Sequence, residues 1–294
     1  MASPDLLKSP GPRLTFPVPL LLVRHPPVPA VNLMFELYDA PSWLLGAMIV
    51  GAFVVFALTG QFAVRRVLPR WFGGKDYNDV VGQCLAASGV FFGITLGLLA
   101  VGAWENFAAV DDAVTQEASD IGVFYRTIDD YPEPQHAILV NQVRTYTRRE
   151  IDIAWPKQQL GITPGPVGNT MLDQIHRTLT SFNPTTEGQK TLHGETLRLF
   201  SQMSGSRRKR LASVSTQLPP IVWFVVFSGS VLTLAQMWLF VVENKRLHDL
   251  LTAMLACMLG LLVFLLAVMD FPFRGDYSVG PDAFELLYSQ LMTK

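Results

Sequence analysis

The chain has 294 residues, of which half are hydrophobic and only 16% are charged, and its mean hydropathy is +0.30. These values are too apolar for an ordinary soluble domain of this size and indicate a membrane protein. The formal net charge of −1 argues against a nucleic-acid partner, because nucleic-acid binding needs a concentrated basic surface.

Residues 1–39 are a proline-rich N-terminal extension that we expect to be disordered. The first 33 residues hold eight prolines, which prevent a stable helix. Their apolar stretch is short, proline-broken and without a small-residue cleavage site, so we do not expect a signal peptide. We hypothesise that Met34 is the native start, which N-terminal sequencing of natively expressed protein would test.

Four charge-free stretches are long enough to cross the hydrocarbon core, which takes about 20 helical residues. They cover residues 40–64, 80–104, 221–242 and 250–269. The first two form a predicted hairpin over 40–104, joined by a connector that contains Pro69, Gly73 and Gly74. The last two form a second hairpin over 219–270, which a C-terminal segment, 271–294, follows. We therefore predict four transmembrane helices.

Residues 105–218 between the hairpins are predicted to form a helical extramembrane domain. No proline occurs between Pro69 and Pro132, and an apolar seam at helical spacing continues from Phe107 to Ile128. The second span is therefore expected to extend beyond the bilayer as one long helix, if Gly122 does not break it. Helices are also expected over 132–155, 169–182 and 186–218, with a loop over 156–168. The predicted fold class is an all-α membrane protein with a helical soluble domain inserted between the second and third spans.

The charges beside the spans favour one orientation. The two short connectors contain six basic residues, whereas the first twenty residues after the second span contain no Lys or Arg. The positive-inside rule therefore favours connectors in the cytoplasm and the helical domain outside. The basic run at 207–210 and Arg274 argue for the opposite orientation.

Several segments together resemble the bacterial bestrophin-like membrane proteins. They include Trp104-Glu105, Glu117-Ala118-Ser119, Tyr125-Arg126, Trp155-Pro156 and Pro272-Phe273-Arg274-Gly275, and the resemblance covers roughly Met34 to Leu291. It implies an oligomeric ion channel, mostly anion-conducting in the bestrophins proper, with an axial pore lined by the second span. It also implies a multi-pass protein of the bacterial inner membrane. The bestrophin pore signature is not evident in residues 80–104, so no pore residue is transferred, and bestrophins keep their large domain in the cytosol.

The second span carries two distinctive faces. At about 100° per residue, one face gathers Gly82, Ala86, Gly89, Gly93 and Gly97. Small residues at this spacing permit close helix packing in membranes. The partner is either another helix of the same chain, which is the favoured interpretation, or a neighbouring subunit.

The opposite face mixes hydroxyls, an aromatic ring and carboxylates. The pore-lining candidates are Cys84, Ser88, Phe91, Thr95, Glu105 and Asp112. Phe91 is a candidate apolar constriction in a narrow water-accessible path. Alternatively, Ser88 and Thr95 bond back to the carbonyl four residues earlier and Phe91 simply packs.

Charge clusters outside the spans have two interpretations each. The acids Glu105, Asp111, Asp112, Glu117 and Asp120 form either a solvated helix face or, in an assembly, a vestibule that concentrates cations. The basic run at 207–210 is either a helix-end charge group or a contact with anionic headgroups.

Enzyme chemistry finds no support in the sequence. No nucleotide-binding, metalloprotease or nucleophile-elbow motif occurs, and the five histidines lack metal-ligand spacing. Cys84 and Cys257 lie inside predicted spans, as packing residues would. We expect no cofactor and no metal, and as partners the lipid bilayer, inorganic ions and further copies of the chain. The predicted function is a candidate ion channel; the alternative is a non-conducting membrane scaffold or sensor whose helical domain binds a partner.

Overall fold

The computed structural model describes residues 41–72, 77–162, 165–214 and 217–293. The predicted N-terminal extension and the choice of Met34 as the start lie outside the described residues. Within the described ranges every regular element is a helix, which confirms the all-α prediction.

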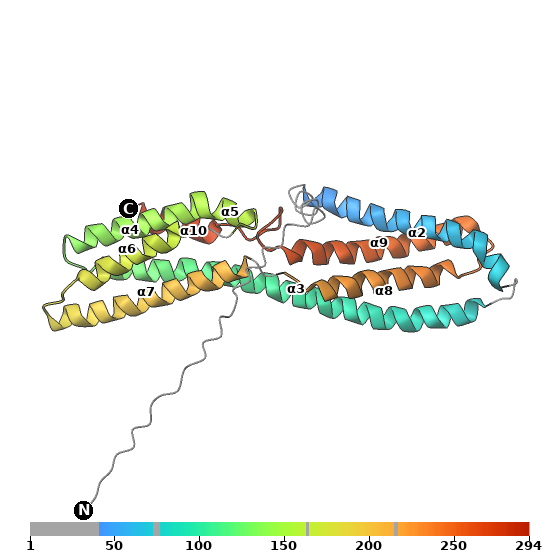
Figure 1. Ribbon diagram of the computed structural model, residues 1–294, viewed down its shortest axis with the longest axis horizontal. Helices are drawn as coiled ribbons and strands as arrows, with labels where there is room; N and C mark the ends of the chain where they lie inside the picture. Colours follow the sequence, from blue (N-terminus) through green and yellow to red (C-terminus); the bar gives the residue numbers. More distant parts are fainter. Residues whose placement is uncertain (1–40, 73–76, 163–164, 215–216, 294) are drawn as a thin grey trace, which may run out of the picture.

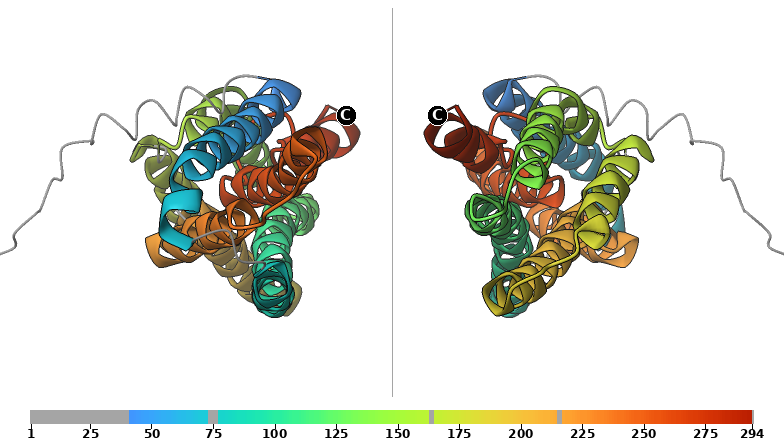
Figure 2. Two further views of the ribbon diagram at one scale, coloured as in Figure 1. Left: turned by 90° about the vertical axis from the view of Figure 1, so that its right-hand side faces the viewer. Right: turned by 90° about the vertical axis from the view of Figure 1, so that its left-hand side faces the viewer.

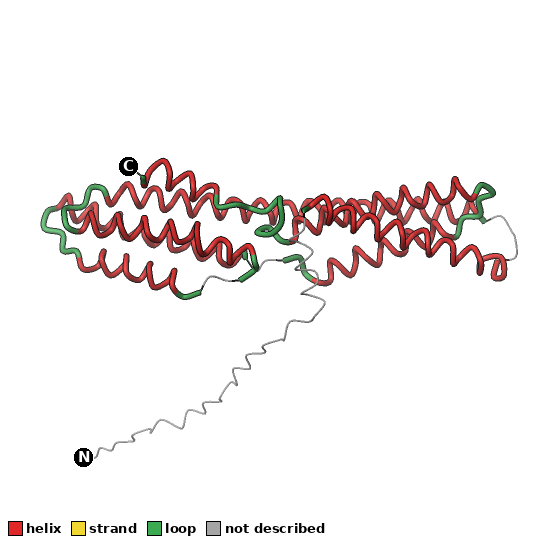
Figure 3. The backbone as a smooth tube through the Cα atoms, turned by 90° about the horizontal axis from the view of Figure 1, so that it is seen from above, coloured by secondary structure: helices red, strands yellow, loops and turns green. Residues whose placement is uncertain are grey.

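The molecule is elongated and has two halves, which Figures 1 and 3 show side by side. The apolar half contains α2 (Ser42–Phe72), the first part of α3 (Asn78–Ile128), α8 (Pro220–Trp238) and α9 (Lys245–Asp270). The polar half contains the rest of α3 and seven further elements: α4 (Gln135–Arg149), the π-helical turn η1 (Glu150–Ala154), α5 (Trp155–Gln159), α6 (Val167–Ser181), α7 (Glu187–Ser213), α10 (Asp282–Leu287) and the π-helical turn η2 (Tyr288–Met292). End-on, the helices of each half form a bundle (Figure 2).

Helix α3 is one unbroken helix of 51 residues that runs through both halves (Figure 1). Gly122 does not interrupt it, so the prediction of a single long helix is confirmed. The predicted seam becomes the core of the polar half, where Val114, Ile121 and Ile128 are buried. A continuous helix fixes the rotation of its apolar part relative to its polar part, because no flexible joint separates them.

Four helices are long and apolar enough to cross a membrane, namely α2, α3, α8 and α9. Helix α8 ends at Trp238, four residues before the predicted end. Beyond it the Asn78 side chain holds the Val241 backbone, donating from Nδ2 to the carbonyl at 2.8 Å and accepting from the amide at 2.9 Å. Helix α9 begins at Lys245, because Asn244 caps the amides of Arg246 and Leu247.

The polar half departs from the predicted helices in one segment. The helix expected over 132–155 contains a π-helical turn, η1, and continues as α5 to Gln159. The loop prediction is therefore wrong at its start, because Pro156 lies in the first turn of α5, where a helix does not need its missing amide. A π-helical turn adds one residue per turn and so rotates the face that the next helical turn presents.

Close helix packing within the chain uses glycines other than those of the predicted face. A Cβ added to Gly260 of α9 would lie 2.9 Å from the Val50 Cα of α2. At Gly60 and Gly229 an added Cβ would overlap the rings of Trp238 and Phe92. These three glycines let α2, α3, α8 and α9 approach one another closely.

Candidate ion pathway along helix α3

The predicted glycine face of α3 has little contact with the rest of the chain. Among the residues that the structure describes, a Cβ added to Gly89, Gly93 or Gly97 would meet nothing within 4 Å, and one added to Gly82 would touch only Phe240, at 3.8 Å. Ala86 is exposed. The favoured interpretation, packing against a helix of the same chain, is therefore wrong for these three glycines, and packing against a neighbouring subunit stays a prediction.

The two hydroxyls of the predicted pore face are held within the chain. Ser88 Oγ donates to Gln236 Oε1 of α8 at 2.7 Å. Thr95 Oγ1 donates to the Phe91 carbonyl, four residues earlier, at 2.9 Å. Thr95 therefore bonds back to the carbonyl four residues earlier, as the alternative expects. Ser88 instead contacts α8, which neither interpretation predicted.

The other four pore-lining candidates lie on the surface of the chain. Cys84, Glu105 and Asp112 are exposed, and the Phe91 ring is 74% exposed. Phe92, the next residue, packs instead against Gly229 of α8. The structure therefore separates the predicted face, because Ser88 contacts α8 whereas Cys84, Phe91, Glu105 and Asp112 are exposed.

The five acids of α3 also separate into two groups. Glu105, Asp111 and Asp112 are exposed, whereas Glu117 and Asp120 are buried. Asp120 accepts from Gln202 Nε2 at 2.7 Å, from Gln116 Nε2 at 2.9 Å and from the Ser206 hydroxyl. For these two positions the prediction of a solvated or vestibule-lining acid is wrong, because both carboxylates face α7.

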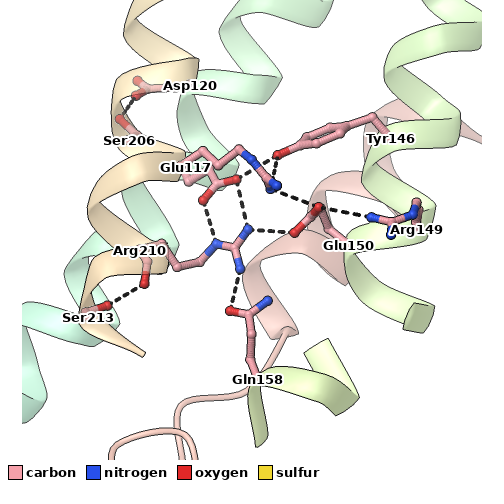
Figure 4. A network of polar contacts seen from close by, with 10 residues as sticks. Glu117, Asp120, Tyr146, Arg149, Glu150, Gln158, Ser206, Arg210 and Ser213 are labelled. Carbon is pink, nitrogen blue, oxygen red and sulfur yellow. Dashed lines mark hydrogen bonds and ion pairs between the residues drawn. The ribbon is translucent and has the colours of Figure 1, made fainter. Parts of the chain in front are cut away.

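Glu117 belongs to a buried ion network in the polar half (Figure 4). Arg210 of α7 donates from Nε and Nη2 to the Glu117 carboxylate at 2.6 and 3.2 Å. The same guanidinium donates from Nη2 to Glu150 Oε2 at 2.7 Å and from Nη1 to Gln158 Oε1 at 2.6 Å. One arginine therefore links α3, α7, η1 and α5.

Arg207 completes the network from the same face of α7. Its Nη1 donates to Glu150 Oε1 at 2.9 Å and to the Tyr146 hydroxyl at 3.2 Å. That hydroxyl in turn donates to Glu117 Oε1 at 3.0 Å. Gly168 borders the guanidinium so closely that an added Cβ would overlap it. The π-helical turn η1 places Glu150 between the two arginines.

The surroundings of these groups keep the arginines charged. Burial alone would lower the pKa of Arg210, but Glu117 and Glu150 outweigh it and raise that pKa far above its ordinary value. Burial opposes the charge of Arg207 too, yet Tyr146, Glu150 and Glu117 raise its pKa. Burial, followed by the two carboxylates, raises the pKa of Tyr146 well above 10.0. The two arginines therefore stay charged, and the Tyr146 hydroxyl stays protonated, at neutral pH.

The network continues toward the apolar half through aromatic contacts. The Arg210 guanidinium lies 5.5 Å from the Trp155 ring centroid and 5.4 Å from that of Phe284. Trp155 meets Phe273, shortly after α9, edge-on at 5.8 Å. At the end of α9, Asp270 accepts from the Leu218 amide at 2.5 Å and from Trp223 Nε1 at 3.1 Å. The two halves are thus joined by packed side chains as well as by α3.

Sequence reasoning missed the role of the basic run at 207–210. Arg207 and Arg210 are buried, whereas Arg208 and Lys209 are exposed. Arg210 does lie in the last turn of α7, as the helix-end interpretation expects, but the headgroup contact is wrong for Arg207 and Arg210 because both are buried. The signal in the sequence was spacing, because Met203, Arg207 and Arg210 lie on one helical face. Among the described residues, no three His, Cys, Asp or Glu side chains lie together as a metal site.

The fold and the exposed, apolar α3 define an all-helical membrane protein. The bestrophin-like domain model matches residues 51–284, and the chain belongs to the bestrophin-like family. No curated protein matches the sequence.

Two solved structures share the fold. A mutant of a bacterial bestrophin homolog from Klebsiella pneumoniae is 12% identical to this chain, with a TM-score of 0.58. A second crystal structure, described as that of a variant of a membrane protein, is 11% identical, with a TM-score of 0.59. Each match covers 82% of this chain and 98% of the other.

Proposed function

We propose that copies of this chain assemble in the bacterial inner membrane, as a multi-pass homo-oligomer, and that inorganic ions cross it along an axis lined by α3. The observation that supports this most is how little of α3 its own chain covers. Only 6% of its most apolar stretch is buried, compared with 39% for α9. A central helix that other copies surround has this property.

The face of α3 that would line the proposed pathway is the one opposite the helices that pack against α3. Helices α8 and α9 contact one side of it. On the side turned away, Val90, Ile94 and Val101 are exposed, and at about 100° per residue the exposed Glu105 and Asp112 continue the same face. In a ring of copies this order would give an apolar constriction followed by a zone of carboxylates.

The carboxylates favour cations as the transported ions. Glu105, Asp111 and Asp112 are exposed on α3, and each copy would add them to the same zone. Such a zone raises the local concentration of cations and lowers that of anions. The polar half, with α4 to α7, would then be the extramembrane domain, inserted between the second and third spans.

The test is ion flux in liposomes, together with the oligomeric state of the purified chain. We expect an oligomer that passes small cations. Replacing Glu105→Gln and Asp112→Asn together should lower the cation-to-anion permeability ratio by about three- to thirtyfold, from the loss of about 0.3–1 kcal/mol per charge in water-filled space. Asp173→Asn, an exposed acid of α6, serves as the control. An intact oligomer without flux would favour the scaffold or sensor alternative.

A further inference from the structure

In the apolar half, α3 has two flanks of opposite shape. One flank carries Gly89, Gly93 and Gly97, where an added Cβ would meet no other atom of the described residues within 4 Å. The other flank carries large apolar side chains, with Phe91 exposed by 74% and Leu98 by 69%. A row of holes and a row of knobs therefore both lack a neighbour within the described part of the chain.

The two rows face in different directions from the same helix. Ser88 and Phe92, which contact α8, lie between the two rows at about 100° per residue. The rows also interleave in height, because Phe91 comes midway between Gly89 and Gly93, and Leu98 directly follows Gly97. Copies that stand parallel around an axis bring residues of the same number to the same height.

We propose that neighbouring α3 helices interlock, with Phe91 of one copy seated between Gly89 and Gly93 of the next and Leu98 beside Gly97. This inference rests on the proposed homo-oligomer and specifies its contact. The contact joins two different flanks, so it is heterologous, and repeating it closes a ring. Phe91 is then an interface residue beside the axis rather than the constriction.

The glycine flank continues into the polar half, where α10 covers part of it, since a Cβ added to Gly122 would lie 3.0 Å from Leu287 Cδ1. Gly122 lies 25 residues, or about seven helical turns, beyond Gly97 and so faces the same way. There α3 borders a groove of about 810 Å³ between Ser119, Gly122 and the exposed Leu286 of α10. Lipid chains do not reach this groove if the polar half lies outside the membrane, and a soluble partner does not reach the glycines. A second copy of the chain matches both parts.

The length of the flank is sufficient for a stable contact. From Gly82 to Arg126 the helix rises about 66 Å, at about 1.5 Å per residue. A strip about 10 Å wide along it covers about 650 Å² per copy, or about 1,300 Å² in total, above the roughly 1,000 Å² that a specific interface needs.

Disulfide trapping tests the contact directly. In a background with Cys84→Ser and Cys257→Ala, the pair Phe91→Cys with Gly93→Cys should cross-link neighbouring copies in native membranes, because each cysteine then meets its partner on the next copy. A non-reducing gel should show a ladder up to the full oligomer. Either substitution alone should give no cross-link. A disulfide-linked dimer from Phe91→Cys alone, the largest product that one thiol per copy allows, would place Phe91 on the axis and overturn the inference.

A bulky substitution tests the same contact without cross-linking. Gly93→Phe should reduce the oligomer fraction by about tenfold, because an overfilled interface does not close. Gly51→Phe is the matched control, since Gly51 of α2 is also empty to 4 Å but lies away from the proposed contact. The wild type could form a conducting oligomer while the cysteine pair gives no ladder and Gly93→Phe leaves the oligomer intact. That result would overturn this inference but not the proposed function. A monomeric, non-conducting wild type would overturn the proposed function as well.

Discussion

Replacement of Arg210 by Met should unfold the polar half at a markedly lower temperature. Arg210 is fully buried and donates four hydrogen bonds, two to Glu117 and one each to Glu150 and Gln158. Its removal leaves two buried carboxylates with less positive charge around them. Breaking a buried ion pair from one side costs about 3–5 kcal/mol of the free energy of unfolding, because the remaining charge is uncompensated.

The expected size can be expressed as a melting temperature. For a domain of about 150–250 residues, each kcal/mol lowers Tm by about 2–4 °C, so Arg210→Met should lower it by about 10 °C. Arg210→Lys should fall between wild type and Met, because one ammonium keeps the charge but lacks the planar group that reaches three side chains.

The assay is thermal unfolding of the purified full-length chain in detergent, followed by tryptophan fluorescence. Trp155 lies against the Arg210 guanidinium and reports on this region. Arg208→Met, an exposed neighbour in the same basic run, is the control and should leave Tm unchanged. Adding Glu117→Gln to Arg210→Met should cost less than the sum of the two single changes. An unchanged Tm for Arg210→Met would refute the reasoning.

Three further predictions concern other parts of the chain. Gly260→Ala should lower Tm by several degrees, because its Cβ would lie 2.9 Å from the Val50 Cα. Gly93→Ala should leave the fold of the single chain unchanged. Equal changes in Tm for the two variants in thermal unfolding would contradict this prediction. The hydrogen bond that His136 Nδ1 donates to the Glu133 carboxylate raises the pKa of His136. This contact therefore stabilises the first turn of α4 fully below about pH 6.5, and its contribution is lost as pH rises through the raised pKa. Hydrogen exchange of 129–137, corrected for intrinsic rates, should therefore be faster at pH 8 than at pH 6, and His136→Gln should remove that difference. A reporter fused to the C-terminus should show exported rather than cytoplasmic activity if the short connectors lie in the cytoplasm, and cytoplasmic activity would reverse the orientation.

Local patterns in the sequence predicted most of the helices. The absence of proline between Pro69 and Pro132, with the seam from Phe107 to Ile128, was enough to predict that α3 is continuous. The four apolar spans followed from length and hydropathy, because a helix satisfies its own backbone and needs only a suitable run of side chains. The predicted helix ends were less accurate where a distant residue binds the backbone. Asn78, for example, binds the Val241 backbone beyond the end of α8.

The candidate site was predicted only in part, because exposure depends on elements far away in the chain. The sequence identified Glu105, Asp112 and Phe91 as notable, and they are exposed, but it grouped them with Ser88 and Glu117, which face α8 and α7. It also pointed to the glycines of α3 for packing within the chain, while Gly60, Gly229 and Gly260 have that role.

By itself, the sequence determined an all-helical membrane protein with four helices apolar enough to cross a membrane, the second of them long, since periodicity and hydropathy are properties of neighbouring residues. Only the tertiary structure decided which charges are solvated and which are buried. Spacing places Arg207 and Arg210 on one face of α7, but only the fold turns that face toward Glu117 and Glu150, which come from segments 57 to 93 residues away. Burial of a charge requires a partner across the fold, and no local pattern contains that partner.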